Sequence, residues 1–493
     1  MRKINTETLL KVLNGNLMAG KGENTAESVT TDSREAGPGE VFFALIGEKN
    51  DGHDYIPQVL EKGGDILVVS DREKVMKALE TCDEVKADFV LVEDTKRSLQ
   101  LLSKWYLETL DLKANIGVTG SVGKTSTRDF LYFVMAEKYR TARSIKNFNN
   151  SFGLPLSILS FPEDTEAAVI ELGMDGKGSI DLLAEIVKPE TGVITNVGVS
   201  HMENFPEDGR KGILNTKLEI TNYFNDDSTL IINSDNDMLS DLDLKLRGIK
   251  GSLIKVGSDD RADYKVSDVQ DKGTEGISFR LEAGGRFFEV ELPVPGAHNA
   301  INATLAIACG VRYGLTIEEA IRGLGRVELT EKRLTLKEKD GIRVIDDTYN
   351  AAPDSVKSAI RTLMATKVPE GGRRILITGD MGELGAMAET GHKSVGAFAY
   401  EQGIDVLLAI GPMSVNTLRG WQEACEAAGD SAENVCQVPY VLISEKTGQG
   451  AEHFENKEMV ISGIREHIHE GDCILVKASR FMQLEKIVKT ILE

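Results

Sequence analysis

Short apolar runs alternate along most of this chain with more polar segments in which apolar residues recur at helical spacing. Such runs are typical of buried parallel strands, and the segments between them are typical of helices that cover a sheet. The alternation predicts an α/β fold with mostly parallel sheets. Strands are expected at residues 40–46, 65–70, 114–118, 167–171, 192–195, 229–233, 343–346, 374–378, 406–410 and 473–476.

Helices are expected where apolar residues keep a helical period after a turn signal. The clearest segments are residues 98–110 and residues 127–138. Gly296-Ala297-His298-Asn299 opens a long helix through residues 302–311, and a shorter helix is expected at residues 317–323.

The expected elements fall into three groups, and a chain of 493 residues is too long for one ordinary domain. The grouping predicts a small N-terminal α/β domain over residues 1–112 and a central α/β domain over residues 113–327. A Rossmann-like C-terminal α/β domain is expected over residues 328–493, with its boundary within residues 325–329.

Charge and composition narrow the function classes. The formal net charge of −21 argues against an extended nucleic-acid surface and against anionic membranes. No apolar run approaches membrane-spanning length, and residues 1–15 lack the apolar stretch of a signal peptide. Free thiols in a reducing cytosol are expected, because the cysteines show neither metal nor redox spacing. They are Cys82, Cys309, Cys425, Cys436 and Cys473.

The segment TGSVGKTS at residues 119–126 lies between an expected strand and an expected helix, which is the layout of a phosphate-binding loop. In such a loop Lys124 would contact the β- and γ-phosphates of ATP, and Thr125 would offer its hydroxyl to Mg²⁺. The spacing is shorter than usual, because Val118 stands where a glycine is common. A glycine-rich surface turn is the alternative. The expected nucleotide-binding residues are Gly120, Ser121, Val122, Gly123, Lys124, Thr125 and Ser126.

Polar residues follow several other strands, at the edge where α/β sheets bind ligands. Glu171 is a candidate Mg²⁺ ligand, since Mg²⁺ prefers oxygen. His201 is a second candidate, although a histidine after a strand can simply form hydrogen bonds. From the residues alone, Lys217 is expected on a helix surface.

Three polar strand ends in the C-terminal region are expected to line one cleft. They are Asp346-Asp347-Thr348-Tyr349-Asn350, the glycine-rich residues 378–385, and Lys477-Ala478-Ser479-Arg480. For the two aspartates, a turn that caps a helix is an equally open interpretation.

Nine motifs in this order resemble those of the Mur ligases, the ATP-dependent amide-forming enzymes of peptidoglycan precursor synthesis. They are TGSVGKTS, KNFNNSFGLPLSIL, ELGM, NVGVSHMENF, NTKLEI, PGAHNAINATLAI, DDTYNAAPDS, GDMGELG and LVKASR. The segment at residues 31–56 is similar to the part of the family that holds a UDP-sugar. The resemblance spans the chain, implies a central domain of P-loop type, and makes the short loop spacing a family feature.

The resemblance also implies a role for each motif. Two Mg²⁺ ions would be held by Thr125, Glu171, His201 and a Lys217 carbamylated by CO₂. The residues that match catalytic ones are Lys124, Glu171, His201 and Lys217. Asn299, Asn302, Arg333 and Asp347 match ATP-contacting residues. The residues that match substrate contacts are Asp32, Ser33, Arg34, Asp51, His53, Asn149, Asn150, Tyr349, Asn350, Lys477 and Ser479.

The best match is the branch of the family that joins UDP-N-acetylmuramoyl-tripeptide to D-alanyl-D-alanine, acting as a monomer. Ala352 and Ala478 depart from the motifs of this branch, which read YNANP and KGSR. A diamino-acid-adding Mur ligase is one alternative, although no DNPR-type motif is present. Folylpolyglutamate synthase shares the central fold but lacks the UDP-sugar segment. An alternative of another class is a nucleotide-dependent switch, which would not need the polar strand ends of the C-terminal region.

Overall fold

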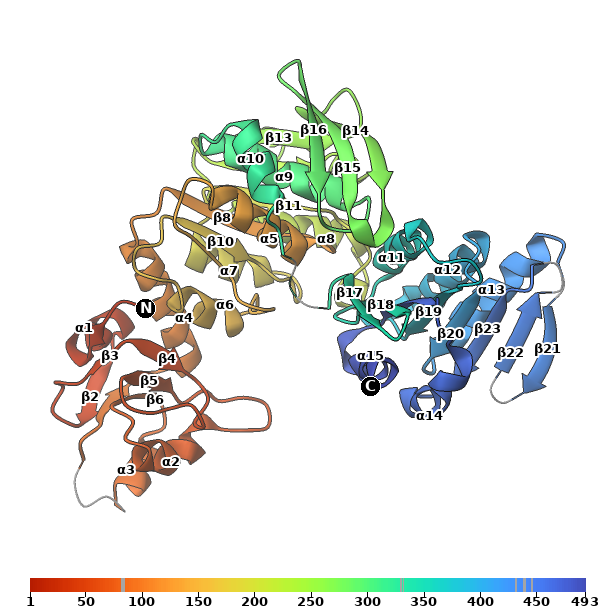
Figure 1. The fold of residues 1–493 in the computed structure, drawn as a ribbon. Coiled ribbons are helices and arrows are strands. Elements are labelled where there is room, and N and C mark those ends of the chain that lie inside the picture. Colours follow the sequence, from red (N-terminus) through yellow and green to blue (C-terminus); the bar gives the residue numbers. More distant parts are fainter. Residues whose placement is uncertain (81–84, 329, 331, 431, 438–439, 445–446) are drawn as a thin grey trace.

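The computed structural model describes residues 1–80, 85–328, 330, 332–430, 432–437, 440–444 and 447–493, of which residues 432–437, 440, 441, 443 and 466 are described by their backbone alone. The chain forms three successive large sheets with helices packed on them, as the sequence predicts (Figure 1). Cys309, Cys425 and Cys473 are buried free thiols. The prediction for Cys82, the one for the Cys436 side chain, and Leu329 at the expected domain boundary lie outside the described part.

The N-terminal sheet is small and mainly parallel. Its strands are β2 (Asn16–Ala19), β4 (Ser28–Thr30), β5 (Glu40–Phe43), β6 (Ile66–Val69) and β7 (Asp88–Leu91), beside a two-stranded pair of β1 (Ile4–Asn5) and β3 (Thr25–Ala26). The order is β2–β7–β6–β5–β4, and β2 alone runs antiparallel. The predicted strand end at residue 46 is wrong, because Leu45 N donates to Phe43 O at 2.9 Å and the chain turns there. The helices are α1 (Thr6–Leu13), α2 (Ile56–Glu61), α3 (Arg72–Leu79) and α4 (Thr95–Thr109).

The central sheet has nine strands in the order β16–β15–β14–β13–β12–β11–β8–β10–β9. Its parallel part is β8 (Ala114–Thr119), β9 (Thr141–Arg143), β10 (Ala167–Glu171), β11 (Thr191–Ile194), β12 (Thr229–Asn233), β13 (Ser252–Gly257) and β14 (Tyr264–Asp271). Its helices are α5 (Lys124–Met135), α6 (Gly153–Leu159), α7 (Ser179–Val187), α8 (Gly209–Leu218), α9 (Asn299–Arg312) and α10 (Ile317–Leu324). Helix α5 begins earlier than predicted, which brings Lys124 into its first turn. Helix α9 begins at Asn299, within the segment predicted to open it.

An antiparallel extension of this sheet was not predicted. Strands β15 (Ile277–Ala283) and β16 (Arg286–Leu292) pair with each other and with β14. Alternate residues of both strands are buried, which is the pattern of a sheet with one wet face.

The C-terminal sheet has eight strands in the order β17–β18–β24–β19–β20–β23–β22–β21, parallel from β18 to β23. The strands are β17 (Thr335–Lys339), β18 (Ile342–Asp347), β19 (Arg374–Gly379), β20 (Val406–Ile410), β21 (Ala432–Gln437), β22 (Tyr440–Ser444), β23 (Gly450–Phe454) and β24 (Cys473–Lys477). The helices are α11 (Pro353–Ala365), α12 (Ala388–Glu401), α13 (Val415–Ala427), α14 (Lys457–His467) and α15 (Glu485–Leu492).

Helix α4 connects the N-terminal and central domains. It packs against α6 and α7, and one apolar cluster continues from the N-terminal sheet through Leu99 and Leu102 into Leu154 and Leu183. The Arg97 guanidinium also lies 2.8 Å from the Glu185 carboxylate. The N-terminal domain is therefore fixed to the central domain through this helix.

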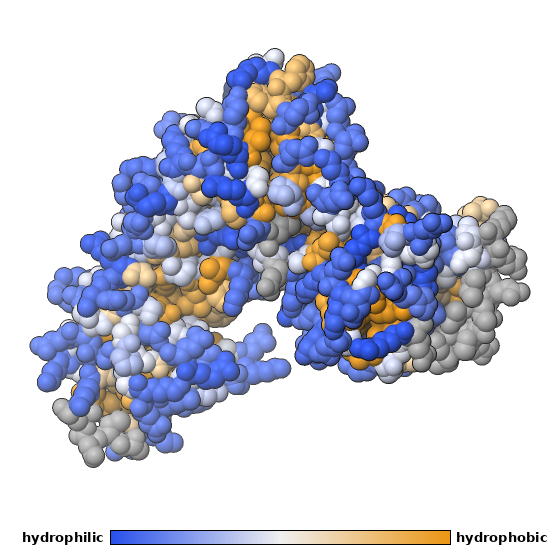
Figure 2. All heavy atoms as spheres, in the orientation of Figure 1, coloured by the Kyte–Doolittle hydropathy of each residue, from blue (hydrophilic) through white to orange (hydrophobic). Residues whose placement is uncertain are grey.

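The visible surface is largely hydrophilic, and open space separates the N-terminal domain from the C-terminal domain in this view (Figure 2). None of the helices in the described ranges is long and apolar enough to cross a membrane.

Candidate active site

The phosphate loop connects β8 to α5 and is shaped by two glycines with positive φ. Gly123 (φ +84°) directly precedes the first residue of α5, so the amide groups of the loop meet the helix N-terminus. Gly120 (φ +153°) lies so close to Thr195 that a Cβ built on it would be 1.9 Å from the Thr195 hydroxyl oxygen. A side chain at Gly120 is therefore excluded both by backbone conformation and by space.

Replacing Gly120 with alanine should weaken ATP binding by about 5- to 150-fold, which corresponds to about 1–3 kcal/mol of strain in the loop. Gly176→Ala is the matched control, because Gly176 has a similar φ of +143° but open space around its Cβ position. Calorimetric titration with ATP checks the prediction. Equal affinities of the two variants would show that the contact with Thr195 does not shape the loop.

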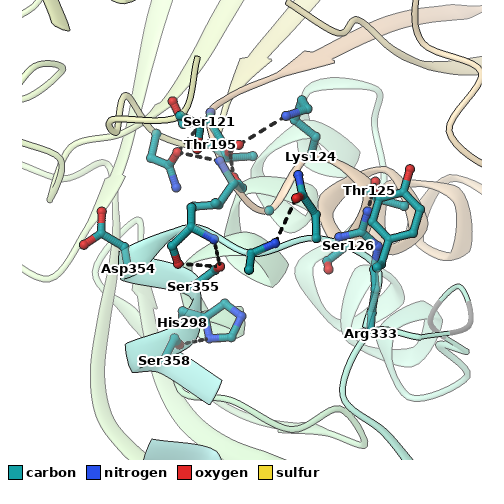
Figure 3. Close-up of a pocket in the computed structure, with 18 of the residues that line it drawn as sticks. Ser121, Lys124, Thr125, Ser126, Thr195, His298, Arg333, Asp354, Ser355 and Ser358 are labelled. Carbon is teal, nitrogen blue, oxygen red and sulfur yellow. Dashed lines mark hydrogen bonds between the residues drawn. The ribbon is translucent and has the colours of Figure 1, made fainter. Parts of the chain in front are cut away.

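Thr195 and Asn196, directly after β11, hold the phosphate loop through hydrogen bonds. The Asn196 side-chain oxygen accepts hydrogen bonds from the amides of Ser121 (3.1 Å) and Val122 (3.0 Å). The Thr195 hydroxyl donates to Val122 O at 2.6 Å. Lys124 Nζ curls over the loop and donates to Gly120 O at 2.8 Å (Figure 3). Withdrawal from water lowers the pKa of Lys124, and the charge of Glu171 partly offsets this.

Glu171, at the end of β10, is the buried carboxylate of the site. It accepts hydrogen bonds from the Thr125 hydroxyl at 2.9 Å and from the Asn149 amide at 2.8 Å. The Arg128 guanidinium lies 3.6 Å from the same carboxylate. This group of oxygens beside a phosphate loop has the ligand chemistry that Mg²⁺ prefers.

Arg333 reaches this group from the C-terminal side. Its guanidinium donates to the Thr125 hydroxyl at 2.9 Å and stacks over the Tyr349 ring at 4.3 Å from the ring centroid. Its buried Nε has no hydrogen-bond partner among the described atoms. Figure 3 shows Arg333 beside Thr125. Two residues of the C-terminal region therefore help to form the nucleotide side of the site.

His201 is the second contact between the two domains. Its Nδ1 lies 2.9 Å from the Glu383 carboxylate, which follows β19. Both residues have φ near +64°, since His201 is at +63° and Glu383 at +64°. Hydrogen bonding to His201 lowers the pKa of Glu383. Because non-glycine residues rarely adopt this conformation, the surrounding structure must hold both residues in place.

Lys217 is not on the surface, and the prediction from the residues alone is wrong. Its side chain on α8 is 0% exposed, and its Nζ makes one weak contact, 3.9 Å from Met174 Sδ. Burial, with the nearby charge of Lys124, lowers the pKa of Lys217 well below its ordinary value. The structure therefore holds this amine without a carboxylate partner among the described residues.

The polar strand ends of the C-terminal sheet meet as predicted. Lys477 Nζ, at the end of β24, donates to the Asp347 carboxylate at 2.6 Å and to Asn350 O at 2.9 Å. The Ser479 hydroxyl accepts from Gly382 N at 2.8 Å. The N-cap of α11 is Ala352, so neither aspartate caps this helix. The helix-capping interpretation of the two aspartates is therefore wrong.

A cavity of about 490 Å³ lies between the central and C-terminal domains. Most of the predicted nucleotide, metal and acceptor residues line it. They are Ser121, Val122, Gly123, Lys124, Thr125, Ser126, Asn149, Glu171, His201, Asn299, Asn302, Arg333, Asp347, Tyr349, Asn350 and Lys477. The predicted residues outside the lining are Gly120, Asn150, Lys217, Ser479 and the N-terminal set Asp32, Ser33, Arg34, Asp51 and His53.

The N-terminal set divides into two turns. Asp32 accepts from Arg34 N at 2.9 Å and pairs with its exposed guanidinium at 2.6 Å. Asp51 accepts from His53 Nδ1 at 2.6 Å, and His53 Nε2 accepts from Ser70 N at 2.9 Å. Both sets of contacts are local and close turns of the backbone. Arg34 is the one member that presents an exposed cation.

Asn150 also has a local role. Its side-chain oxygen accepts hydrogen bonds from Phe152 N at 3.1 Å and from Gly153 N at 2.8 Å. It therefore closes the turn that precedes α6, whereas its neighbour Asn149 faces Glu171.

A buried ionic network lies next to the phosphate loop and was not predicted from the sequence. Arg128 and Asp129, both in α5, pair at 2.6 Å, and Arg143 lies 3.0 Å from the same carboxylate. Asp129 also accepts from Thr330 N at 3.0 Å, on the chain that enters the C-terminal domain. Two adjacent charged residues directly after a phosphate loop were the signal in the sequence.

The cavity contains oxygen ligands that suit a metal ion. Nowhere in the described ranges do three or more His, Cys, Asp or Glu side chains form a metal-binding group. The donors that do fit Mg²⁺ are the Thr125 hydroxyl and the Glu171 carboxylate, which already lie together. One hydroxyl and one carboxylate suffice when phosphate oxygens supply other ligands.

Comparison with known proteins identifies the fold family. The model of the Mur ligase middle domain matches residues 118–310, and that of the "Mur ligase, glutamate ligase domain" matches residues 326–480. The model of the "Mur ligase family, catalytic domain" matches residues 25–106. The chain belongs to the Mur ligase family. A three-domain α/β architecture is the fold of its solved relatives too.

Two relatives of this Mur ligase carry the name UDP-N-acetylmuramoyl-tripeptide–D-alanyl-D-alanine ligase. The protein of Bacillus subtilis (strain 168) is 36% identical over 496 residues, covering 100% of this chain and 99% of the relative. That of Escherichia coli (strain K12) is 29% identical, with the same coverage. A crystal structure of MurF from Acinetobacter baumannii is 25% identical, with a TM-score of 0.83 over 100% of this chain and 99% of that chain.

The two departures from the family motifs have different surroundings in this Mur ligase. Ala352 lines the cavity, so its short side chain changes a wall that a ligand can touch. Ala478 is fully buried in the apolar cluster under α14 and α15. A Cβ built on Gly379 would lie 2.9 Å from the Ala478 methyl, so the extra methyl of Ala478 packs against a glycine. Ala352 alone is therefore placed to affect ligand selection.

Proposed function

We propose that this Mur ligase joins D-alanyl-D-alanine to the terminal carboxylate of UDP-N-acetylmuramoyl-tripeptide at the expense of ATP. The observation that carries the proposal is the shared cavity, in which a phosphate loop meets the Thr125–Glu171 pair and the Asp347–Lys477 pair of the other domain. The names of the relatives give the substrates. In this proposal residues 1–112 bind the UDP-sugar, residues 113–327 bind ATP, and residues 328–493 bind the dipeptide and part of the ATP.

The reaction needs activation, because a carboxylate has no good leaving group for attack by an amine. An oxygen of the tripeptide carboxylate attacks the γ-phosphorus of ATP in line, ADP leaves, and an acyl phosphate forms. The neutral dipeptide amine then attacks the acyl carbon, the bond to the phosphate oxygen breaks, and phosphate leaves while the nitrogen gives up one proton to solvent. Water must be kept out while the acyl phosphate exists.

The chain supplies charge and position for these steps. Lys124 would neutralise the β- and γ-phosphate oxygens, and the N-terminus of α5 would add its partial positive charge. Asn299 and Asn302, whose side chains are linked at 3.1 Å beside Gly123, would contact the adenine side. Arg333 and Asp347 would hold the nucleotide from the C-terminal domain. Tyr349, Asn350, Lys477, Ser479, Asn149 and Asn150 are the proposed surroundings of the peptide substrates.

Two Mg²⁺ ions form part of the proposal. Thr125, Glu171, His201 and a carbamylated Lys217 would hold them, and the ions would neutralise charge on the phosphate oxygens. Lys217 suits carbamylation because a buried, neutral amine can attack CO₂ and lose a proton, which gives a carboxylate at the end of the side chain. The absence of a carboxylate partner for Lys217 among the described residues supports this step.

Phosphate release with a panel of substrates tests the proposed function. Release should require a UDP-N-acetylmuramoyl-tripeptide and D-alanyl-D-alanine together. Release that needs a free diamino acid with a UDP-N-acetylmuramoyl-dipeptide would identify the diamino-acid-adding branch. Release without either substrate, or release triggered by a protein, would identify a nucleotide-dependent switch.

Domain closure is expected on binding. The N-terminal set that would hold the UDP-sugar lies outside the cavity, and open space separates the outer domains (Figure 2). An ATP analogue with UDP-N-acetylmuramoyl-tripeptide should therefore lower the radius of gyration in small-angle X-ray scattering. The forward scattering should also give the mass of a monomer. An unchanged radius at saturation would contradict closure.

The cytoplasm is the proposed location of the enzyme, because ATP and a UDP-linked precursor are both found there. Fractionation of cells that express the chain at its natural level, with detection by antibody, tests this proposal.

A further inference from the structure

A second cavity, of about 420 Å³, adjoins the first. The phosphate loop and the start of α11 form a common wall, because the two cavities share six lining residues: Ser121, Val122, Asn196, Ser200, Ala352 and Asp354. A group bound in the second cavity would therefore lie next to the place where the γ-phosphate is transferred. Neither the motifs nor the relatives' names assign a ligand to this cavity.

Asp354 is the anionic group on the common wall. It lies in the first turn of α11 and is exposed, and no hydrogen bond or ion pair with its carboxylate is formed within the described ranges. In Figure 3 it lies on the opposite side of the site from Arg333, toward Ser121. The carboxylate is thus available to a cation that enters beside the phosphate loop.

Arg210, in the first turn of α8, is the cationic group of the second cavity. Its guanidinium pairs with Asp237 at 2.5 Å and donates to Val197 O at 2.7 Å. Its buried Nε, however, has no acceptor within the described structure. The hydrogen bond and charge of Asp237 and, less strongly, the charge of Asp354 raise the pKa of Arg210, so Asp354 and Arg210 interact electrostatically.

The passage between the two groups is kept open by Gly198. A Cβ built on this residue would lie 3.4 Å from Ser121 Cβ and 3.8 Å from the Asp354 carboxylate. Gly198 does not have the positive φ that would require glycine. The absence of a side chain therefore leaves room between Ser121 and Asp354 and is not needed for the backbone.

We propose that the second cavity is the subsite for D-alanyl-D-alanine, with the dipeptide ammonium at Asp354 of the C-terminal domain and the dipeptide carboxylate at Arg210 of the central domain, so that the central domain shares in binding the dipeptide. A dipeptide is a zwitterion, and its two ends are separated by roughly 7 Å of extended chain. It needs one anion and one cation at the two ends of a short cavity, which Asp354 and Arg210 supply. The ammonium end lies on the wall shared with the phosphate loop, so its nitrogen faces the acyl phosphate and can attack once it has lost one proton to solvent. The methyl of Ala352 gives this wall an apolar surface for an alanine side chain.

This inference rests on the proposed function, and the test separates the two. The variants are Asp354→Asn and Arg210→Met, with Glu458→Gln as the control, because Glu458 is an exposed acid in the first turn of α14. The dipeptide KM should rise about 10- to 100-fold in each variant, which is the usual effect of losing a hydrogen bond to a charged group. The KM values for ATP and for the tripeptide should not change.

Trapping with hydroxylamine isolates the first half of the reaction. Tripeptide hydroxamate should form from ATP and UDP-N-acetylmuramoyl-tripeptide at the wild-type rate in both variants. A wild-type protein that forms no hydroxamate and shows no dipeptide-dependent phosphate release would overturn the proposed function itself. Wild-type activity with an unchanged dipeptide KM in both variants would overturn the subsite alone.

Dipeptides capped at one end test whether the ammonium binds at Asp354 and the carboxylate at Arg210. N-acetyl-D-alanyl-D-alanine, which has no ammonium, should inhibit the wild type and Asp354→Asn equally but should inhibit Arg210→Met less. D-alanyl-D-alanine amide, which has no carboxylate, should inhibit the wild type and Arg210→Met equally but should inhibit Asp354→Asn less. If both compounds lost the same inhibitory strength in both variants, the assignment of the two dipeptide ends to Asp354 and Arg210 would be contradicted. If Arg210→Met folds poorly by thermal melting, Arg210→Gln, which also removes the charge but stays polar, takes its place.

Gly198→Val gives an independent result. The added side chain should narrow the passage beside Ser121 and raise the dipeptide KM by about tenfold or more, while hydroxamate formation continues. An unchanged dipeptide KM in this variant would show that the ligand does not use the second cavity.

Discussion

Replacing Lys124 with methionine should lower the rate of phosphate release by about 100- to 1,000-fold, which is the usual effect of removing one charged donor from a developing anion. Methionine keeps most of the length and the apolar stem of lysine. In the structure Lys124 Nζ is held over the loop by Gly120 O at 2.8 Å and Ser121 O at 3.3 Å, so it is already positioned above the phosphate site. The substitution therefore removes a positive charge beside the place where the γ-phosphate becomes more negative.

Steady-state kinetics with saturating substrates and thermal melting measure this effect. Lys250→Met is the control, since Lys250 is an exposed lysine of the same domain. Both variants should melt within a few degrees of the wild type. A Lys124→Met protein with more than a third of the wild-type rate would show that the loop does not act on ATP.

Replacing Lys217 with methionine should abolish most of the turnover and yet stabilise the fold. Lys217 is 0% exposed, and Met174 Sδ is the one hydrogen-bonding contact of its Nζ among the described residues, so burial of its amine costs on the order of 1–3 kcal/mol that methionine would not incur. The variant should melt higher at neutral pH. Turnover should fall by about 100-fold or more, because the carbamate and the Mg²⁺ that it holds would be lost.

Three measurements check this prediction together. Removal of bicarbonate and CO₂ should slow the wild type, and added bicarbonate should restore its rate. A carbamate signal should appear in ¹³C NMR after incubation of the wild type with ¹³C-bicarbonate and should be absent from Lys217→Met. Normal turnover of the variant, together with a wild type that is indifferent to bicarbonate, would contradict the carbamate.

The strands buried on both faces were predicted most accurately. Strands β10, β12 and β20 have the predicted bounds, because a continuous apolar run between turn residues is a strong local signal. Strands β15 and β16 were missed, although alternate residues are buried in both. Such a pattern is weaker than an apolar run, because half of its positions are polar.

Polar residues at the ends of predicted strands indicated where the site lies, but they did not indicate which side chains contact each other there. Asp347 and Lys477 end strands of the C-terminal sheet and Glu171 ends a strand of the central sheet. The three line one cavity because the carboxyl ends of the strands of both sheets face it. The burial of Lys217 could not be inferred from the sequence of α8, since it depends on what packs against that helix. The same is true of the pairing of His201 with Glu383, which joins two domains across 182 residues of sequence (383 − 201).

Isotope transfer tests the central claim most directly. UDP-N-acetylmuramoyl-tripeptide labelled with ¹⁸O in its terminal carboxylate is turned over with ATP and D-alanyl-D-alanine, and the released phosphate is analysed by mass spectrometry. An acyl phosphate predicts one ¹⁸O in each released phosphate and a product whose mass equals that of both substrates minus labelled water. Unlabelled phosphate, with the amide formed, would contradict the acyl phosphate.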